Sequence, residues 1–272
     1  ETLFAFVDAG DVLSARPAAA DSLHVLGEFA GMLNHPPLPG GEGPGEGVAA
    51  PSTAGHPHPD PPPQGGGGLL NNLVARALNA LPRPQGLAIT LEKNLPVAAG
   101  LGGGSADAGA VFRIVEALHG LPADWPARAA RLGADVPACF RSRTHIGLGT
   151  GTEQVEVEDD LAGKPVLLVN PRVPLGTGPV FSAWEGADRG PLPAGPASRI
   201  AREGRNDLEA PATRLCPAIA DVLAALRCTS PWLARMSGSG ATCFALYDSI
   251  AARDAAAQAL PEGWWRMAGC LR

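Results

Sequence analysis

One glycine-rich stretch decides how this chain folds: Leu95-Pro96-Val97-Ala98-Ala99-Gly100-Leu101-Gly102-Gly103-Gly104-Ser105-Ala106-Asp107. Residues 87–92 before it alternate like a strand, and residues 105–119 after it repeat apolar side chains with the period of a helix. Glycines let the backbone come close to a ligand. Because the free N–H groups and the dipole at a helix start attract anions, this pattern predicts a site for a nucleotide phosphate.

Ser105 is expected to cap this helix, and its hydroxyl is also placed to contact a phosphate. Two common phosphate loops match poorly. In a dinucleotide-binding fingerprint the third glycine would fall on Ser105, and no acidic residue closes a second strand about 20 residues later. A Walker loop needs Gly-Lys-Ser/Thr after the glycines. An ordinary flexible turn is the remaining alternative, which is disfavoured because clustered glycines at a helix entry cost backbone entropy.

The composition narrows the class of protein. The chain has 272 residues, of which 45% are hydrophobic, so it can form one large or two modest domains. Its net charge of −6 argues against a nucleic-acid binder that works by neutralising phosphates. The sequence contains no long apolar span and does not start like a signal peptide, so we expect a cytoplasmic bacterial protein with no membrane segment.

The metal-ligating residue types show no ligand pattern. The five cysteines lack a Cys-x-x-Cys spacing, and we expect reduced, buried thiols. The six histidines lack zinc spacing. Asp107, expected in the first turn of the helix, is interpreted as a complement to the helix dipole rather than a metal ligand.

The chain is predicted to have two domains, residues 1–160 and 161–272, in an α+β arrangement. Residues 36–68 form an insert rich in proline and glycine, which cannot bury enough apolar surface to offset its ordering entropy. We expect a disordered surface loop there, with a partner-binding segment as the less favoured alternative. From residue 165 onward the pattern predicts the order βαββαβ, the ferredoxin-like split motif. Nucleotide and substrate would then lie in the cleft between the domains.

Two further segments carry groups for phosphoryl transfer, which needs a phosphate cradle, positive charge, and a group that orients or deprotonates the acceptor hydroxyl. Asp135 lies between Gly133 and Pro137, where the chain turns out of a helix, and it is a candidate base. Capping of a following helix is the alternative. The segment Ser237-Gly238-Ser239-Gly240 can close over the first glycine-rich stretch or form an ordinary tight turn between strands.

These segments, in this order, resemble the GHMP kinases, the small-molecule kinases related to galactokinase, homoserine kinase, mevalonate kinase and phosphomevalonate kinase. The resemblance rests on residues 95–107, on Leu132-Gly133-Ala134-Asp135-Val136-Pro137 and on Met236-Ser237-Gly238-Ser239-Gly240-Ala241-Thr242-Cys243-Phe244. It implies the two-domain GHMP kinase fold, with an N-terminal domain like ribosomal protein S5 and a C-terminal ferredoxin-like domain. It also implies an ATP-dependent kinase acting on an alcohol group of a small molecule, with Mg²⁺ arriving bridged by the ATP phosphates.

The resemblance also implies roles for individual residues. Asp135 matches the catalytic aspartate, Lys93 a position near adenine and ribose, and Asn72 one near the nucleotide base. For Lys93 and Asn72, a solvated surface position is the alternative. Thr177 matches a position near the substrate. The implied ATP-binding set is Asn72, Lys93, Pro96, Val97, Ala98, Ala99, Gly100, Leu101, Gly102, Gly103, Gly104, Ser105 and Ala106, and the substrate- and phosphate-binding set is Thr177, Ser237, Gly238, Ser239 and Gly240.

The sequence departs from the family at its start. The matching branch of the family begins with a strand carrying Ala-Lys-x-Asn-Leu, followed by Asp-Gly-Tyr-His, and these supply the catalytic lysine and part of the substrate pocket. Glu1 resembles a position about 30 or more residues into that pattern, and no residue here matches the lysine. We therefore expect weak or absent turnover from these 272 residues and full turnover from a longer natural form.

Three other functions stay open at this point. One is a family member with another substrate, of the homoserine or mevalonate type. Another is a catalytically impaired ATP binder or interaction scaffold. The weakest is a dinucleotide oxidoreductase, which would have to bind NAD(P).

Overall fold

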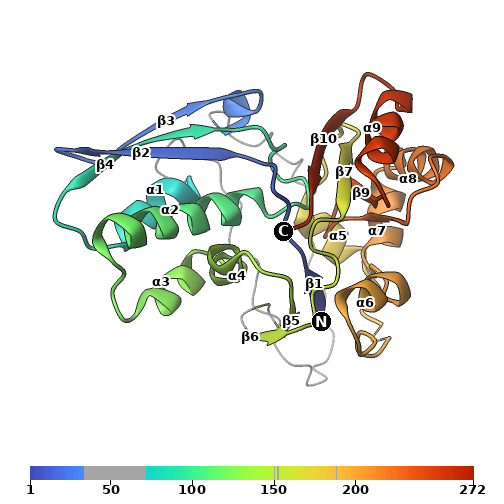
Figure 1. Cartoon of the computed structure of the whole chain (residues 1–272), viewed down its shortest axis with the longest axis horizontal. Helices are drawn as coiled ribbons and strands as arrows, with labels where there is room; N and C mark the ends of the chain where they lie inside the picture. Colours follow the sequence, from blue (N-terminus) through green and yellow to red (C-terminus); the bar gives the residue numbers. More distant parts are fainter. Residues whose placement is uncertain (34–71, 150, 152, 188) are drawn as a thin grey trace, which may run out of the picture.

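The computed structural model describes residues 1–33, 72–149, 151, 153–187 and 189–272, which form two halves side by side (Figure 1). The first half is built on a sheet of strands β2, β4 and β3, and the second on a sheet of β10, β7, β9 and β8. Helices accompany both sheets, so the α+β class is confirmed. The predicted insert at residues 36–68 lies outside the described residues.

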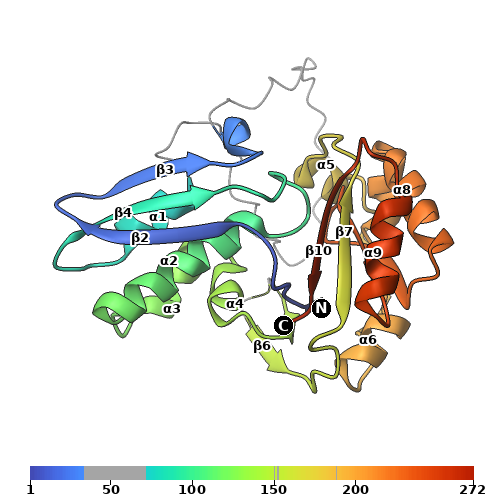
Figure 2. The ribbon, with the colours of Figure 1, turned by 45° about the horizontal axis from the view of Figure 1, so that its top comes forward.

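Helices cover one face of the first sheet (Figures 1 and 2). Strand β2 (Val12–Ala18) runs antiparallel to β4 (Gly86–Glu92), and β3 (Ser22–Leu26) runs parallel to β4. Helices α1 (Leu73–Ala80) and α2 (Gly103–His119) pack on the sheet because every second residue of β4 is apolar and buried. This core contains Leu87, Ile89 and Leu91 from the sheet and Val74, Val111, Phe112 and Val115 from the helices.

A smaller sheet completes the first half. Helices α3 (Trp125–Leu132) and α4 (Val136–Arg141) follow α2, and the chain then enters β5 (His145–Leu148) and β6 (Glu153–Glu156). Strand β1 (Thr2–Phe4) pairs antiparallel with β5, in the order β1-β5-β6. The beginning of the chain thus lies beside the segment that follows α4.

The second half has the ferredoxin-like arrangement predicted from the sequence. Its sheet is antiparallel in the order β10-β7-β9-β8, which is the order 4-1-3-2 within this half. The strands are β7 (Pro165–Asn170), β8 (Leu233–Met236), β9 (Cys243–Leu246) and β10 (Trp265–Cys270), and the crossover helices are α8 (Ala218–Cys228) and α9 (Ile250–Ala259).

Several short helices were not predicted. Between β7 and α8 the chain forms α5 (Thr177–Ser182), α6 (Ala197–Glu203) and α7 (Glu209–Leu215). A 3₁₀ helix, η1 (Ala30–Leu33), follows β3. Each is seven residues or shorter, which is less than two helical turns, so a helical period cannot be distinguished in the sequence.

Strand β7 joins the two halves because it is buried on both faces. Leu167 and Val169 pack into the core under α8, whereas Val166 and Leu168 belong to a second cluster on the opposite face. That second cluster contains Leu95, the first residue of the glycine-rich stretch. The stretch is therefore seated between the two sheets.

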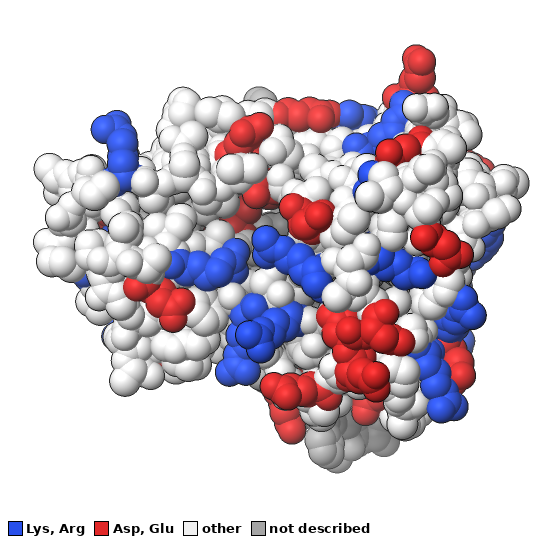
Figure 3. Space-filling view, viewed as in Figure 1, with Lys and Arg blue, Asp and Glu red and all other residues white. Residues whose placement is uncertain are grey.

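The sequence predictions about membrane segments and cysteine burial can be compared with the structure. None of the described helices is long and apolar enough to cross a membrane. Acidic and basic side chains lie side by side over the face shown in Figure 3. All five cysteines are free; three are buried as predicted and Cys270 is partly buried, but Cys228 is exposed, so the expectation of buried thiols is wrong there.

Candidate active site

Helix α2 begins two residues earlier than the sequence predicts. Gly102 caps it in the left-handed conformation, with φ of 63°, and the first bond of the helix runs from the Ala106 N–H to the Gly102 carbonyl at 2.9 Å. The N–H groups of Gly103, Gly104 and Ser105 come before that bond, so they are the helix-start donors. The prediction that Ser105 caps the helix is wrong, because it lies inside the first turn.

The glycines of the stretch meet different surroundings. At Gly102 an added Cβ would meet no atom of the described residues within 4 Å, and the residue is exposed. At Gly100, where φ is 75°, a Cβ would come too close to the Ser237 carbonyl oxygen and within 2.8 Å of Gly240 N. The stretch is therefore open to solvent at Gly102, where the helix starts, and closely packed two residues earlier, at Gly100.

The structure brings the two glycine-rich segments together, although 137 positions separate them. The Ser237 hydroxyl donates to the Gly100 carbonyl at 2.8 Å, and the Thr242 N–H donates to the Ala99 carbonyl at 3.2 Å. The segment at 237–240 is not merely a turn between β8 and β9, because it is bonded to the stretch that precedes α2. These bonds hold the C-terminal half against the helix start.

Neutral side chains brace the second segment from behind. Asn206 Nδ2 donates to the carbonyls of Met236 and Gly238, at 3.0 and 2.8 Å. The hydroxyls of Thr177 and Ser239 lie 3.1 Å apart, so the fold brings Thr177 to the segment, and its place near the substrate stays a prediction. These partners are amides, hydroxyls and carbonyls, and the carboxylate of Glu209 accepts the Met236 N–H at 3.4 Å, one residue before the segment.

Asp135 lies beside the helix start of the first half. It stands at the N-cap position of α4, as the alternative predicted, but its side chain makes no capping hydrogen bond there. A Cβ on Gly133 would lie 3.8 Å from Ser105 Oγ, which places the turn carrying Asp135 next to the first turn of α2. Burial raises the pKa of the Asp135 carboxyl, and the attraction of His145 partly opposes this. A carboxylate that is more basic than usual suits a proton acceptor.

Lys93 is buried, so the alternative of a solvated surface position is wrong. Its side chain is 4% exposed, and its ammonium pairs with Asp11 and, at 2.9 Å, with Asp107. Asp107 is the fifth residue of α2 and not in its first turn, so its predicted role as a complement to the helix dipole is wrong. Asp11 was not predicted, since only the fold brings it to Lys93 from 82 positions away.

Of the remaining predicted residues, some cap or shape the local backbone and others pack in an apolar cluster. Asn72 caps α1, and its Oδ1 accepts the Val74 N–H at 2.8 Å. Val97 and Leu101 pack with Leu95 in the cluster against β7. Ala98 is exposed and has a φ of 53°, an uncommon conformation for a residue with a Cβ. The packing of Leu95, Val97 and Leu101 thus fixes where the backbone of the stretch lies.

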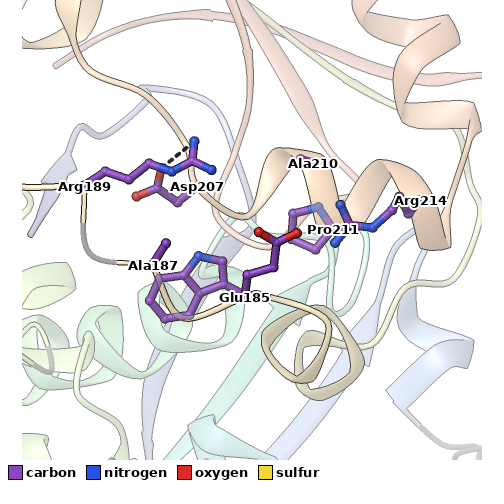
Figure 4. Close-up of a pocket in the computed structure, with 8 residues that line it drawn as sticks. Glu185, Ala187, Arg189, Asp207, Ala210, Pro211 and Arg214 are labelled. Atoms are coloured by element: carbon purple, nitrogen blue, oxygen red, sulfur yellow. Dashed lines mark ion pairs between the residues drawn. The ribbon is translucent and has the colours of Figure 1, made fainter.

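A separate small pocket lies over α7 (Figure 4). Arg189 and Asp207 face each other across it at 3.9 Å, and Arg214 and Glu185 contribute to its walls. Its volume of about 30 Å³ admits a water-sized group and is far too small for a nucleotide. The candidate site is placed at the glycine-rich segments by the helix-start donors and by the docking of the two segments. Among the described residues, no cluster of three or more His, Cys, Asp or Glu side chains could hold a metal ion.

Comparisons with known families agree with this geometry. The family models for the N-terminal and the C-terminal domain of GHMP kinases match residues 72–150 and 194–264. The first match contains the glycine-rich stretch and Asp135, and the second contains the segment at 237–240. Fold and site together therefore define a small-molecule kinase of the GHMP class, whose members use ATP as the phosphate donor.

Individual relatives narrow the class. The 4-diphosphocytidyl-2-C-methyl-D-erythritol kinase of Novosphingobium aromaticivorans is 58% identical over the whole chain and 84% of its own length, and that of Erythrobacter litoralis is 57% identical over the whole chain and 90% of its length. A crystal structure of 4-(cytidine 5'-diphospho)-2C-methyl-D-erythritol kinase matches with a TM-score of 0.72 at 29% identity, over 99% of this chain and 88% of that one. A homoserine kinase from Cytophaga hutchinsonii, at 18% identity and a TM-score of 0.61, shares the fold. The chain belongs to the 4-diphosphocytidyl-2-C-methyl-D-erythritol kinase family.

Proposed function

We propose that this protein transfers the γ-phosphoryl group of ATP to the 2-hydroxyl of 4-diphosphocytidyl-2-C-methyl-D-erythritol, a cytidine diphosphate-linked methylerythritol, in the making of isoprenoid precursors. The observation that carries the proposal is the docking of the segment at 237–240 onto Gly100, beside the turn that carries Asp135. The names of the relatives support the choice of this substrate over homoserine or mevalonate.

The first glycine-rich stretch is proposed to bind ATP. The N–H groups of Gly103, Gly104 and Ser105 would donate to the phosphates, and the open space at Gly102 fits a bound anion. Residues Pro96 to Leu101 would shape the cradle, and Ala106 continues the helix behind it. Asn72 and Lys93 are proposed neighbours of the nucleoside. Lys93, being buried in an ion pair, would act through Asp11, which accepts the N–H groups of Asn94 and Leu95.

Asp135 is proposed as the group that accepts the proton of the substrate hydroxyl as the bond to phosphorus forms. Thr177, Ser237, Gly238, Ser239 and Gly240 would contact the substrate or the transferred phosphate from the other side. Mg²⁺ would arrive with ATP, bridged by its phosphates and keeping several waters, where it neutralises developing charge. The described residues offer no cage of their own for it.

The test is substrate-dependent release of ADP from ATP and Mg²⁺. The assay is run on these 272 residues and on a longer form that continues ahead of Glu1. Release that requires 4-diphosphocytidyl-2-C-methyl-D-erythritol supports the proposal. Release with homoserine or mevalonate instead would replace the substrate, and ATP binding without turnover in the longer form would leave an impaired ATP binder.

A further inference from the structure

A buried charged cluster lies directly beneath the first glycine-rich stretch. It consists of Lys93 between the carboxylates of Asp11 and Asp107, and the three side chains are 3% to 6% exposed. One ammonium needs only one carboxylate for neutrality, and burying an additional charge is costly. The second carboxylate therefore requires an explanation other than pairing.

The cluster touches both ends of the stretch. Asp11 Oδ1 accepts the N–H groups of Asn94 and Leu95, at 2.7 and 2.8 Å, and so fixes the point where the stretch leaves β4. A Cβ on Gly103 would lie 3.4 Å from Lys93 Nζ and 3.5 Å from Asp11 Oδ2. The start of α2 therefore rests on the ammonium and the carboxylate, close to where a phosphate would bind.

The charge of this cluster changes near neutral pH. The pKa of Asp107 is raised to about 7. Burial raises it most, the positive charge of Lys93 lowers it, and the negative charge of Asp11 raises it. The other titratable group facing Asp107 comes from α4, the thiol of Cys139, and burial raises its pKa to about 12, so it stays neutral. The cluster is therefore neutral when Asp107 is protonated and carries one negative charge when it is not.

We propose that Asp11, Lys93 and Asp107 act as positioning residues for the phosphate-binding stretch, and that Asp107 takes up a proton when the nucleotide binds. This inference rests on the proposed ATP site. A triphosphate at the start of α2 repels a negative cluster beneath it and so favours the protonated form of Asp107. Nucleotide affinity is then highest below pH 7 and falls as the pH rises through the two pKa values of Asp107, free and bound.

The experiment measures ADP binding by calorimetry at pH 6 and pH 8, and in two buffers of different ionisation enthalpy near pH 7.5. The variant is Asp107→Asn, which mimics the protonated form and leaves Asp11 to pair with Lys93. The matched control is Glu116→Gln, an exposed acid on the same helix. Because the nucleotide itself titrates equally in all samples, only differences between proteins count.

For the unmodified chain and Glu116→Gln we expect about a fivefold greater loss of affinity between pH 6 and pH 8 than for Asp107→Asn, the part of the tenfold effect of a one-unit pKa shift that falls within this pH range. Proton uptake is expected in the first two proteins and not in the third. Equal pH dependence and equal proton uptake in all three would overturn the inference. If Asp107→Asn does not fold, proton uptake by the unmodified chain near pH 7.5 is compared with the uptake expected from the ionisation of ADP itself, and no uptake beyond that amount overturns the inference. No nucleotide binding at any pH would instead overturn the proposed function.

Discussion

The two glycine-rich segments are built in opposite ways. The first, at residues 95–107, rests on a buried ion cluster and opens to solvent at Gly102. The second, at 237–240, is braced by amides and hydroxyls, and it packs so closely that a Cβ on Gly240 would lie 2.9 Å from the Met236 sulfur. The first segment has open space at Gly102 close to buried charged side chains, whereas the second is closely packed and contains no charged residue.

This difference assigns different tasks to the two halves of the molecule. A site for a highly charged phosphate needs helix-start donors, adjustable charge and room, which the first segment has. The second segment has none of these, but its bonds to Ala99 and Gly100 fix the first. Chemistry is therefore expected to depend on the first half and precise geometry on the second.

The largest effect is expected from Asp135→Asn, which tests whether the first half supplies the group that accepts the proton of the substrate. The change removes the proposed proton acceptor but keeps the size of the side chain. Turnover should fall about a thousandfold, within the range of general-base contributions, while the KM for ATP stays nearly constant. The measurement is substrate-dependent ADP release by the longer form. Asp254→Asn, on exposed α9, is the control and should keep full activity.

The next largest effect is a difference in stability between alanine substitutions at two glycines of the first segment. Gly100→Ala places a Cβ against the backbone of Ser237 and Gly240 at a φ of 75°, so we expect a loss of more than about 3 kcal/mol in the free energy of unfolding. Gly102→Ala has a similar φ of 63° but open space around it, so about 1 to 2 kcal/mol is expected from the conformation alone. Urea unfolding of the two variants measures both values. Equal losses would show that docking against the second segment contributes nothing.

The sequence predicts much of the fold because its strongest patterns are local. The alternation in β4, the long period of α2 and the βαββαβ order of the second half can all be recognised from neighbouring residues. Helices α5, α6 and α7 could not be, since each is too short to show a period. The start of α2 was misplaced because a serine is the commoner cap, whereas here Gly102 takes a conformation that favours glycine.

The site was predictable only where a motif carries it. Asp135 and the glycines stand in recognisable local surroundings, but the Asp11–Lys93 pair joins residues 82 positions apart. A lone aspartate before a strand gives no sign that it will be buried, and Lys93 looks equally suited to solvent. Gly151, whose Cβ would lie 3.4 Å from Asp135 Oδ1, was missed for the same reason.

A smaller effect tests whether the second segment acts through the first. Ser237→Ala removes the 2.8 Å bond to the Gly100 carbonyl, and Ser249→Ala removes the 3.1 Å bond that caps α9. Each should cost about 1 kcal/mol of stability. Only Ser237→Ala should also raise the KM for ATP, by about severalfold, because only that bond positions the phosphate-binding stretch. Unchanged KM values in both variants would mean that the second segment is merely structural.

The smallest effect concerns the electrostatics of Asp135. A proton acceptor must be ionised, so kcat/KM should rise with pH through the pKa of Asp135, which burial has raised. His145 opposes that rise, and it stacks on Phe4 with ring centroids 4.8 Å apart, so His145→Phe keeps an aromatic ring there and removes the attraction. The acid limb of the pH profile should then move to higher pH, whereas His24→Gln, at an exposed position on β3, should leave it in place. A limb that stays in place in His145→Phe would mean that the first half sets the reactivity of Asp135 by burial alone.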